Sequence, residues 1–561
     1  MSYHGPKLDP VPGAVTVWNW LFDGQTSVEQ QPAPLLRRHG FRDAATGSHT
    51  SFQSIKEQAT QCATALTSIY GLKARETVAV LAQNSVRYAI TVFAAGRVGA
   101  TVTALPSTAM AQDIAHYLSA SSARIVFYDK TTAGEVAAAA AFKGPAQEPY
   151  TLISLDGAGE TGGKSMPSLQ QLVAEGCSLQ EKAPAAAAWT FPQGKTNKDV
   201  CAFLVFSSGT TGKPKAISHA NMIAQCMQMR ALISGQPGVL LGILPFFHIT
   251  GLVHLLHLPV LLDQDIVIMG QFTLSSMLHT VVKYRCEELW LVPPLLIRMV
   301  SDDVVNKYDT SFVRQFNTGA APLSPKIIEK LAIAYPKVAL RQAWGMTESC
   351  SCLTVTPPGL ATYTHAAKVG KVLAGTEIKI VSAETGKQLS LGEEGELWAR
   401  GPQVTMGYLD NEDETRRVYD ADGFLHTGDL GTVHPDGFVT IHDRIKEMIK
   451  VRGHGVAPAE LEDTLLGHPH VVDAAVIGVP HDYSGEVPRA YVVLAAGIPS
   501  SDKTRCGLEL HVERYKARYM RLAGGVEFVE AIPKNTAGKV LRKVLKEDYK
   551  KRSEKEAAAK L

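Results

Sequence analysis

A long stretch without formal charge constrains the fold of this chain more than any other feature. No Asp, Glu, Lys or Arg lies between Arg230 and Asp263, and residues 238–262 are long enough to cross a bilayer. The stretch also contains Pro245, Pro259 and three histidines, whose backbone and ring groups would lack hydrogen-bond partners in lipid. We therefore expect a buried strand and helix in the core of a large α/β domain, and no transmembrane segment.

Length and charge bound the classes of function. The chain has 561 residues, of which 45% are hydrophobic, which is enough for more than one domain core. Its 56 basic residues nearly balance its 54 acidic residues, so nucleic acid is not an expected partner. The eight cysteines form no C-x-x-C pair, and we interpret Cys350 and Cys352 as buried or half-buried free thiols and not as a redox site.

Hydrophobic periodicity divides the chain into regions. Up to about residue 200, predicted helices at 55–70 and 85–97 alternate with strands such as 77–81, which indicates βαβ units and a mostly parallel sheet. From about residue 369, short β-prone runs such as 377–381 and 438–442 alternate with turn signals. This pattern predicts a small antiparallel or barrel-like module.

The pattern changes again after about residue 446. A predicted helix at 458–466 is followed by strands at 471–479 and 490–494, a helix at 508–519 and a basic helical tail. These elements predict a compact α+β domain at the end of the chain.

A loop rich in small and hydroxyl residues follows an apolar strand at 203–206. It contains Ser207, Ser208, Gly209, Thr210, Thr211 and Lys215. Small residues let backbone N–H groups converge on an anion, hydroxyls add donors and lysines add charge, so we expect a phosphate-binding loop. It is not a Walker A loop, because Gly209 and Gly212 are too close together and Pro214 replaces the Mg²⁺-binding hydroxyl residue. The alternative is a polar strand-to-helix turn.

Further motifs follow this loop in a fixed order. They are PFFH at 245–248, TGAAPL at 318–323, QAWGMTE at 342–348, GEL at 395–397, MGY at 406–408, TGD at 427–429, DRIKE at 443–447, RG at 452–453, APAELE at 457–462 and PKNTAGK at 533–539. The ordered set resembles the adenylate-forming superfamily of acyl-CoA synthetases, 4-coumarate–CoA ligases and beetle luciferases, over nearly the whole chain.

The resemblance implies a fold and a division into domains. Residues 1–443 would form an N-terminal adenylation domain of two doubly wound α/β subdomains plus a small β-barrel at about 369–443. Residues 447–561 would form a small mobile α+β domain, with a hinge near Lys446. After adenylation this domain would rotate, withdraw Lys539 and present Arg452 and Gly453, which would contact CoA.

The resemblance also implies a reaction. ATP and a carboxylic acid would give an acyl-adenylate and pyrophosphate, and the CoA thiol would then displace AMP to form a thioester. Positioning and electrostatic stabilisation of the crowded phosphates are the catalytic tasks.

Roles at the nucleotide follow from the same resemblance. Residues 207–211 and Lys215 would hold the β- and γ-phosphates, Thr347 the α-phosphate, and Glu348 a Mg²⁺ ion, which prefers oxygen ligands. Trp344 would offer an aromatic face to adenine, with a core tryptophan as the alternative. Asp429 would accept from the ribose hydroxyls, and Lys539 would bridge the attacking carboxylate and the α-phosphate. The remaining residues expected at ATP or AMP are Gln342, Arg444, Lys446 and Lys450.

The residues expected around the acyl group differ from those of the hydroxycinnamate branch. The resemblance places the acyl group against His248, Thr250, Ala320, Ala343 and Met346, with His248 between the acyl pocket and the thiol tunnel. Where hydroxycinnamate ligases have Tyr and Ser, this chain has Thr250 and His254, and Ala343 replaces a glycine. One added methyl group shifts discrimination by about 1–3 kcal/mol. Gly455 also replaces a glutamine that touches the adenylate. We therefore predict a medium-chain or aryl acid rather than 4-coumarate.

The sequence leaves two alternative functions open. The chain could pass its acyl group to another acceptor, such as a carrier protein, or it could be a catalytically silent homologue that acts as a binding protein. The presence of Thr347, Glu348, Asp429, Arg444 and Lys539 argues against the silent homologue.

The last three residues form a possible targeting signal. Ala559, Lys560 and Leu561 form a small–basic–Leu tripeptide close to the peroxisomal S-K-L signal. We expect a peroxisomal import receptor to bind it, which would place the protein in the peroxisome. If the signal is not read, an ordinary tail and a cytoplasmic protein are expected.

Overall fold

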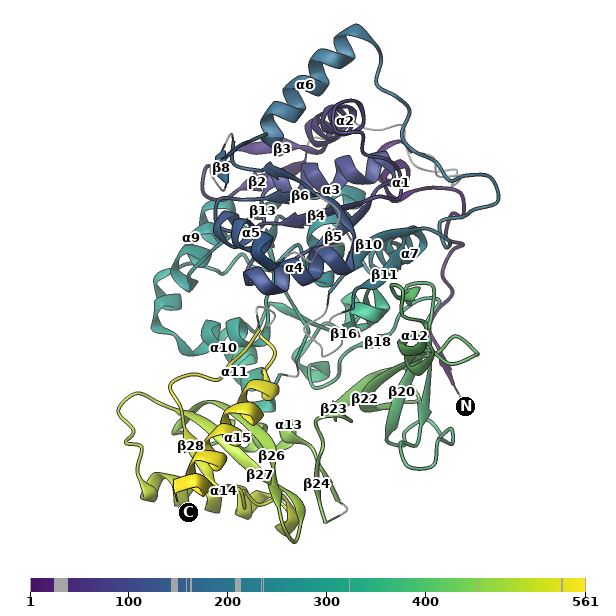
Figure 1. Ribbon diagram of the computed structural model, residues 1–561. Helices are drawn as coiled ribbons and strands as arrows, with labels where there is room; N and C mark the ends of the chain where they lie inside the picture. The colour runs from purple at the N-terminus through teal and green to yellow at the C-terminus, as the bar shows by residue number, and fades with distance from the viewer. Residues whose placement is uncertain are drawn as a thin grey trace.

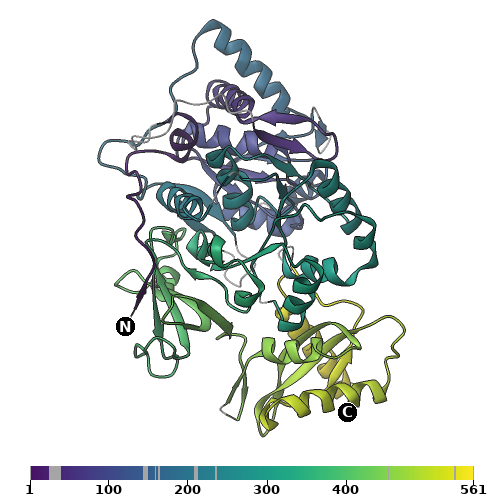
Figure 2. The same cartoon turned by 180° about the vertical axis from the view of Figure 1, so that it is seen from behind.

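The computed structural model describes residues 2–24, 39–142, 150–157, 159–161, 164–206, 213–233, 235, 237–321, 323–452, 454–535 and 538–559. A large N-terminal part contains three main sheets, and a smaller C-terminal part, yellow and light green in Figure 1, lies against one end of it beside α10 and α11. Figure 2 shows the same arrangement from behind.

Seven strands of the described chain form the first sheet. Their order is β21 (Gly407–Tyr408), β11 (Lys215–Ser218), β10 (Cys201–Val205), β5 (Thr101–Ala104), β4 (Thr77–Leu81), β6 (Ala123–Tyr128) and β7 (Thr151–Ser154). The strands from β10 to β7 run parallel, and β11 pairs antiparallel with β10. The parallel βαβ units predicted for this region are confirmed.

Nine strands, again counted over the described residues, form the second sheet. Their order is β18 (Lys371–Val372), β17 (Ser351–Val355), β16 (Ala339–Met346), β15 (Gln315–Thr318), β14 (Glu288–Trp290), β12 (Leu240–Gly242), β13 (Ile266–Ile268), β2 (Gly40–Asp43) and β3 (His49–Ser51). The run from β16 to β2 is parallel, and the edges on both sides are antiparallel.

Helices cover both faces of these two sheets, so each is doubly wound. Their bounds are α1 (Val17–Phe22), α2 (Phe52–Ser68), α3 (Val86–Val98), α4 (Ala111–Ala120), α5 (Ala133–Ala139), α6 (Leu169–Lys182), α7 (His219–Arg230), α8 (Leu258–Leu262), α9 (Leu274–Tyr284), α10 (Pro293–Ser301) and α11 (Pro325–Ala334). One apolar core joins the inner faces of both sheets, while α4 and α5 cover the outer face of the first and α9–α11 the outer face of the second. A short hairpin, β8 (Gly159–Thr161) and β9 (Lys164–Met166), lies outside the main sheets.

The uncharged stretch lies inside the shared core. It forms β12, a π-helical segment η2 (Gly251–His257) and α8, and every residue of η2 is buried. No helix in the described part of the chain is both long and apolar enough to span a bilayer. Burial between two sheets explains its lack of charge, as predicted.

A third sheet follows in the chain. Five strands of the described residues pair in the order β1 (Tyr3–His4), β19 (Glu377–Val381), β20 (Gly395–Arg400), β22 (Leu425–Val433) and β23 (Val439–Arg444). All neighbours are antiparallel, and helix α12 (Glu412–Val418) connects β21 to β22. The module predicted as antiparallel or barrel-like is an antiparallel sheet, one edge of which comes from the start of the chain, and residues 369–371 bridge to β23 at its other edge.

The C-terminal part has its own sheet and core. The sheet order is β25 (His454–Val456), β24 (Ile449–Val451), β27 (Gly485–Leu494) and β26 (Val471–His481), with β28 (Val526–Phe528) beside β27. Helices α13 (Pro458–Leu466), α14 (Asp502–Tyr515) and α15 (Arg542–Ala559) pack on it. The predicted helix 458–466 agrees with α13 at both ends.

Candidate functional site

The predicted site residues are carried by strands that end near the C-terminal part. β16 carries Gln342, Trp344 and Met346 and runs directly into Thr347 and Glu348. Parallel sheets bring ligand-binding groups to the carboxyl ends of their strands. β22 and β23 of the third sheet, which include Asp429 and Arg444, lie beside this edge in the structure.

Asp429 lies at the centre of a buried polar cluster. Its Oδ2 accepts a hydrogen bond of 2.8 Å from Trp344 Nε1, and its Oδ1 lies 3.0 Å from Arg444 Nε. Burial raises the pKa of Asp429, while Arg444 and the Trp344 hydrogen bond act in the opposite direction. Asp429 therefore has a fixed orientation, with its charge balanced by a partly exposed arginine.

Trp344 lies in a hydrophobic core, whereas the resemblance implies a ring that faces adenine. Only 7% of it is exposed, and it packs with Leu353, Ile380 and Leu397 in the core of the third sheet. The alternative of a core tryptophan describes this environment, and the hydrogen bond to Asp429 gives the ring a polar task that the sequence did not indicate. An adenine-facing role for Trp344 stays a prediction.

Lys215 and Glu348 form a second charged pair. Lys215 Nζ lies 3.7 Å from Glu348 Oε1 and 5.1 Å from the centre of the Tyr408 ring. Tyr408 donates its hydroxyl to the same Glu348 oxygen at 3.0 Å. Burial lowers the pKa of Lys215, and Glu348 opposes that shift. Tyr408 was part of a family motif but had no assigned role, so this contact adds a residue to the site.

Lys539 reaches this region from the C-terminal part. The loop that carries it is held by the Lys539 N–H, which donates to Asn535 Oδ1 at 2.8 Å, and by the Gly538 N–H, which donates to the Asn535 carbonyl at 2.8 Å. Burial lowers the pKa of Lys539, as does Arg444, whereas Glu447 and Asp429 raise it. A lysine from one end of the molecule thus lies within the electrostatic reach of Asp429 and Arg444.

Gly538 shows how closely this loop approaches the N-terminal part. Its φ is +78°, and a Cβ added there would lie 2.9 Å from Pro294 Cδ and 3.5 Å from Val292 Cβ. A side chain would strain the backbone and collide with the start of α10. Only glycine permits this contact without a shift.

A buried network anchors the hinge region to the C-terminal part. Arg542, the first residue of α15, donates to Glu447, to both carboxylate oxygens of Glu462 at 2.6 and 2.7 Å, and to the Val476 carbonyl at 3.2 Å. Asp443 accepts from the Ala459 N–H at 3.0 Å, in the first turn of α13. The sequence alone does not reveal this role of Arg542, because a basic residue at the start of a basic helix is usually solvated.

On the acyl side, the candidate residues come from three segments. His248 is half-buried, its Nδ1 accepts from the Thr250 N–H at 3.4 Å, and burial lowers its pKa to about 4. Ala320 has a φ of +71°, and a Cβ on the preceding Gly319 would lie 3.0 Å from the Ala343 carbonyl oxygen. The 318–321 turn and the middle of β16 therefore lie against each other.

Other predicted residues are placed elsewhere or lie outside the described residues. Gln342 is buried and donates to the Ala366 carbonyl. Lys446 and Lys450 are exposed, and the Lys450 N–H donates to Glu486 at 3.0 Å. Arg452 stacks on Tyr483, 4.5 Å from the ring centre. Predictions that fall outside the described residues concern Ser207, Ser208, Gly209, Thr210, Thr211, Gly453, Lys560 and Leu561.

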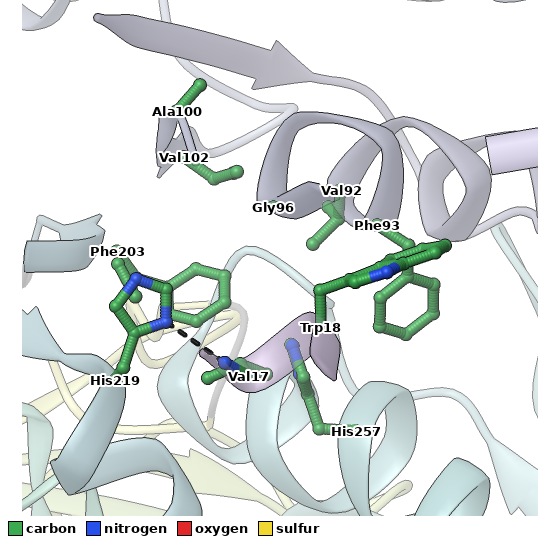
Figure 3. Close-up of a pocket in the computed structure, with 11 residues that line it drawn as sticks. Val17, Trp18, Val92, Phe93, Gly96, Ala100, Val102, Phe203, His219 and His257 are labelled. Carbon is green, nitrogen blue, oxygen red and sulfur yellow. Dashed lines mark hydrogen bonds between the residues drawn. The ribbon is translucent and has the colours of Figure 1, made fainter. Parts of the chain in front are cut away.

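A separate cavity of about 20 Å³ lies in the shared core. Figure 3 shows it lined by Val17, Trp18, Phe93, His219 and His257, with His219 Nδ1 accepting from the Val17 N–H at 3.1 Å. Burial lowers the pKa of His219 to about 3 and that of His257 to about 4, so both rings are neutral. The cavity has room for about one water molecule and contains none of the predicted site residues.

Cysteine chemistry takes no part in this site. All eight cysteines lie in described ranges and are free, and Cys350 and Cys352 are buried. Burial raises the pKa of Cys352 to about 11 and raises the pKa of Cys350 well above its ordinary value, which keeps both as thiols. The interpretation as buried free thiols is confirmed.

Known proteins resemble this chain over nearly its full length. The family model for AMP-binding enzymes matches residues 28–409, and the model for the AMP-binding enzyme C-terminal domain matches residues 460–539. Peroxisomal OPC-8:0-CoA ligase 1 of Arabidopsis thaliana is 33% identical over 519 residues, covering 91% of this chain and 90% of the relative. The 4-coumarate–CoA ligase 2 of Oryza sativa subsp. japonica is 33% identical over 518 residues, covering 90% of this chain and 88% of the relative.

Solved structures agree with these relatives. ATP-bound MatB from Rhodopseudomonas palustris superposes with a TM-score of 0.80 at 26% identity, over 95% of this chain and 99% of that one. An anthranilate CoA ligase in complex with anthranoyl-AMP shares the fold, with a TM-score of 0.81 over 99% of both chains at 22% identity. The chain therefore belongs to the family of AMP-binding enzymes and is an AMP-forming acyl-CoA synthetase, which uses ATP to ligate a carboxylic acid to CoA.

Proposed function

We propose that this enzyme activates a medium-chain or aryl carboxylic acid in two steps that use two placements of its C-terminal part. The first step forms the acyl-adenylate with Lys539 beside Asp429 and Arg444. The second follows rotation about Lys446, which removes Lys539 and turns Arg452 and residue 453 toward the site for attack by the CoA thiol. The observation that carries this proposal is the docking of Gly538 against Pro294, which supports a position of Lys539 near Asp429 and Arg444, two of the proposed nucleotide-binding residues.

Each charged group has a task in the first step. Asp429 accepts from the ribose hydroxyls while Trp344 and Arg444 fix its orientation. Lys215, with residues 207–211, holds the β- and γ-phosphates, and Thr347 contacts the α-phosphate. Lys539 neutralises charge between the attacking carboxylate and that phosphate, where electrostatic stabilisation is worth most.

The acid site is proposed from neighbouring segments. Thr250, Ala320, Ala343 and Met346 line the acyl group, and His248, whose ring is neutral, stands between it and the CoA thiol. Gln342, Lys446 and Lys450 complete the proposed nucleotide contacts.

A Mg²⁺ ion fits this donor set. Glu348 is a partly buried carboxylate beside Lys215, and Mg²⁺ is commonly held by one or two carboxylates together with substrate phosphates. No cluster of three or more His, Cys, Asp or Glu side chains in the described part could hold a metal alone, so ATP oxygens would supply the other ligands. When bound, the ion would neutralise phosphate charge.

Substituting Lys539 tests the division into steps. We expect Lys539→Ala to abolish pyrophosphate release from ATP and acid, and to leave thioester formation from pre-made acyl-adenylate and CoA within about threefold. Lys543→Ala is the matched control, because Lys543 is exposed on α15 and its one ion pair with a described residue is to Glu547 one turn away, at 3.8 Å. Survival of both half-reactions in Lys539→Ala would remove the proposed role. Adenylation without any CoA-stimulated AMP release would favour a different acyl acceptor, such as a carrier protein.

We also propose that the enzyme works in the peroxisome. Support comes from the tripeptide Ala559-Lys560-Leu561 and from the relative named as a peroxisomal CoA ligase. Deleting residues 559–561 from an N-terminally tagged protein should move it from peroxisomes to the cytosol in fluorescence microscopy. Unchanged peroxisomal location would contradict the proposal.

A further inference from the structure

Polar side chains gather on the inner face of the nine-stranded sheet, deeper than the proposed acyl-binding residues. Directly paired residues of parallel strands point to the same side, and Trp290, Asn317 and Arg341 are paired in register across β14, β15 and β16. Ala343 lies two residues beyond Arg341 on the same face, about 7 Å along the strand. This face is turned toward the shared core, which contains Trp290 and contacts Ala343.

His254 covers this face from the π-helical segment η2. Its ring stacks on Trp290 with 4.5 Å between ring centres, and its Nε2 lies 2.9 Å from Ser351 Oγ. Burial lowers the pKa of His254 to about 3, and Arg341 lowers it too, so the ring is neutral and Arg341 is near it. His254 therefore lies over the Trp290–Asn317–Arg341 row.

Three nitrogens of this cluster have no hydrogen-bond partner among the described residues. They are His254 Nδ1, Asn317 Nδ2 and Arg341 Nη2, and the three residues are only 1%, 4% and 6% exposed. Asn317 and Arg341 can only donate through these atoms. Buried donors without acceptors are rare in native proteins, and several together on one face call for an oxygen atom between them.

The charge of Arg341 decides what kind of oxygen fits. Glu288 is half-buried, lies two residues before Trp290 on the same face of β14 and acts on Arg341 through its charge, so the arginine already has a counter-charge. A second carboxylate at this place would bury a net negative charge, which is unfavourable. A neutral hydroxyl or carbonyl oxygen would accept from the donors without that penalty.

We propose that the acid activated by this enzyme carries a hydroxyl or carbonyl oxygen at its far end, which Asn317, Arg341 and His254 bind. The inference rests on the proposed acyl site, because the cluster lies beyond Ala343 when approached from Thr347 along β16. The expected substrate is therefore an acid with an apolar middle and a neutral polar end, and not a wholly apolar acid. His254 and Asn317 are then specificity-determining residues.

The proposal can be tested with straight-chain acids of matched length, from hexanoate to dodecanoate, that end in a methyl group, a hydroxyl, a methyl ketone or a second carboxylate. Pyrophosphate release gives kcat/KM for each. At the best length, we expect the hydroxyl or keto acid to exceed the methyl-ended acid by at least about tenfold, and the dicarboxylate to be the poorest. Equal use of all ends, or preference for the methyl-ended or dicarboxylic acid, would overturn the inference while leaving the proposed function intact.

Variants assign the preference to this cluster. His254→Phe and Asn317→Leu should each reduce the ratio of polar-ended to methyl-ended kcat/KM by at least about tenfold. His257→Phe is the matched control, since His257 is also a buried, neutral histidine on η2 but lines the separate cavity of Figure 3, and the ratio should not change. If a variant fails to fold, the wild-type comparison alone decides. Inactivity of the wild type on every acid would overturn the proposed acyl site and the inference with it.

Discussion

The Lys539 side chain lies where its positive charge is destabilised. Burial and the nearby Arg444 both favour the neutral amine, while Glu447 and Asp429 favour the ammonium. The pKa of Lys539 is therefore lower than the ordinary lysine value of 10.5. A phosphate or carboxylate that enters the site would stabilise the ammonium form of this lysine.

The lowered pKa predicts an alkaline limit for the first step only. The ammonium is the form that stabilises anions, so adenylation should fall as pH rises through a pKa below 10.5, whereas thioester formation from pre-made adenylate should lack this limb. In Lys539→Arg the limb should disappear, because a guanidinium stays charged, although the rate itself should be lower. Pyrophosphate release measured against pH, with saturating ATP, checks this. An unchanged limb in Lys539→Arg would assign it to another group.

At the scale of elements, α15 is fixed at its first residue. Arg542 joins the hinge segment, α13 and β26 through Glu447, Glu462 and the Val476 carbonyl. The Glu462 side chain is only 14% exposed, so removal of its partner would leave a buried charge without compensation. This one arginine thus holds together the elements around the Lys539 loop.

We expect Arg542→Met to reduce the free energy of unfolding of the C-terminal part by about 3–5 kcal/mol. Arg542→Met combined with Glu462→Met should recover part of that loss, because the most buried of its carboxylate partners is then no longer charged, while Glu447 still lacks its arginine. Denaturant unfolding followed by circular dichroism gives both values. A double variant as unstable as the single one would show that packing, and not charge pairing, is the main contribution of Arg542.

Local patterns of apolar residues predicted several elements well. β4, β19 and α13 agree with their predicted bounds because a continuous buried run, alternation and helical spacing are each local properties of the sequence. Contacts between distant residues were not predictable in the same way. The Trp344–Asp429 hydrogen bond joins residues 85 positions apart, and β1 has two residues, too few to show a pattern. The third sheet was predicted as antiparallel or barrel-like, but the strand that covers its edge was not, because that pairing joins distant residues.

At the scale of the whole molecule, the two parts meet at several separate contacts. Besides the approach of Gly538 to Pro294, Lys326 on α11 donates to the Gly467 carbonyl at 3.0 Å. The proposed rotation of the C-terminal part would have to break and re-form the contact between Gly538 and Pro294.

A side chain added at Gly538 should therefore slow the first half-reaction and not the second. Gly538→Val would place a branched side chain against Pro294 and in a left-handed backbone conformation. We expect pyrophosphate release to fall at least about tenfold, since overpacking costs about 1–3 kcal/mol, and thioester formation from pre-made adenylate to be little changed. Gly497→Val is the control, because Gly497 also has a positive φ, of +82°, but has open space around its Cβ. Equal loss in both half-reactions would mean that Gly538 has no docking role.

The short strand β1 has a consequence for handling the protein. Tyr3 and His4 cover the edge of β19, and the Gly5 N–H donates to the Thr376 carbonyl at 2.8 Å. Without these residues, β19 would present unpaired backbone groups to solvent, and an uncovered sheet edge is a template for pairing between molecules. The first few residues thus protect this edge from pairing with another molecule. Deleting them should reduce solubility before it reduces activity.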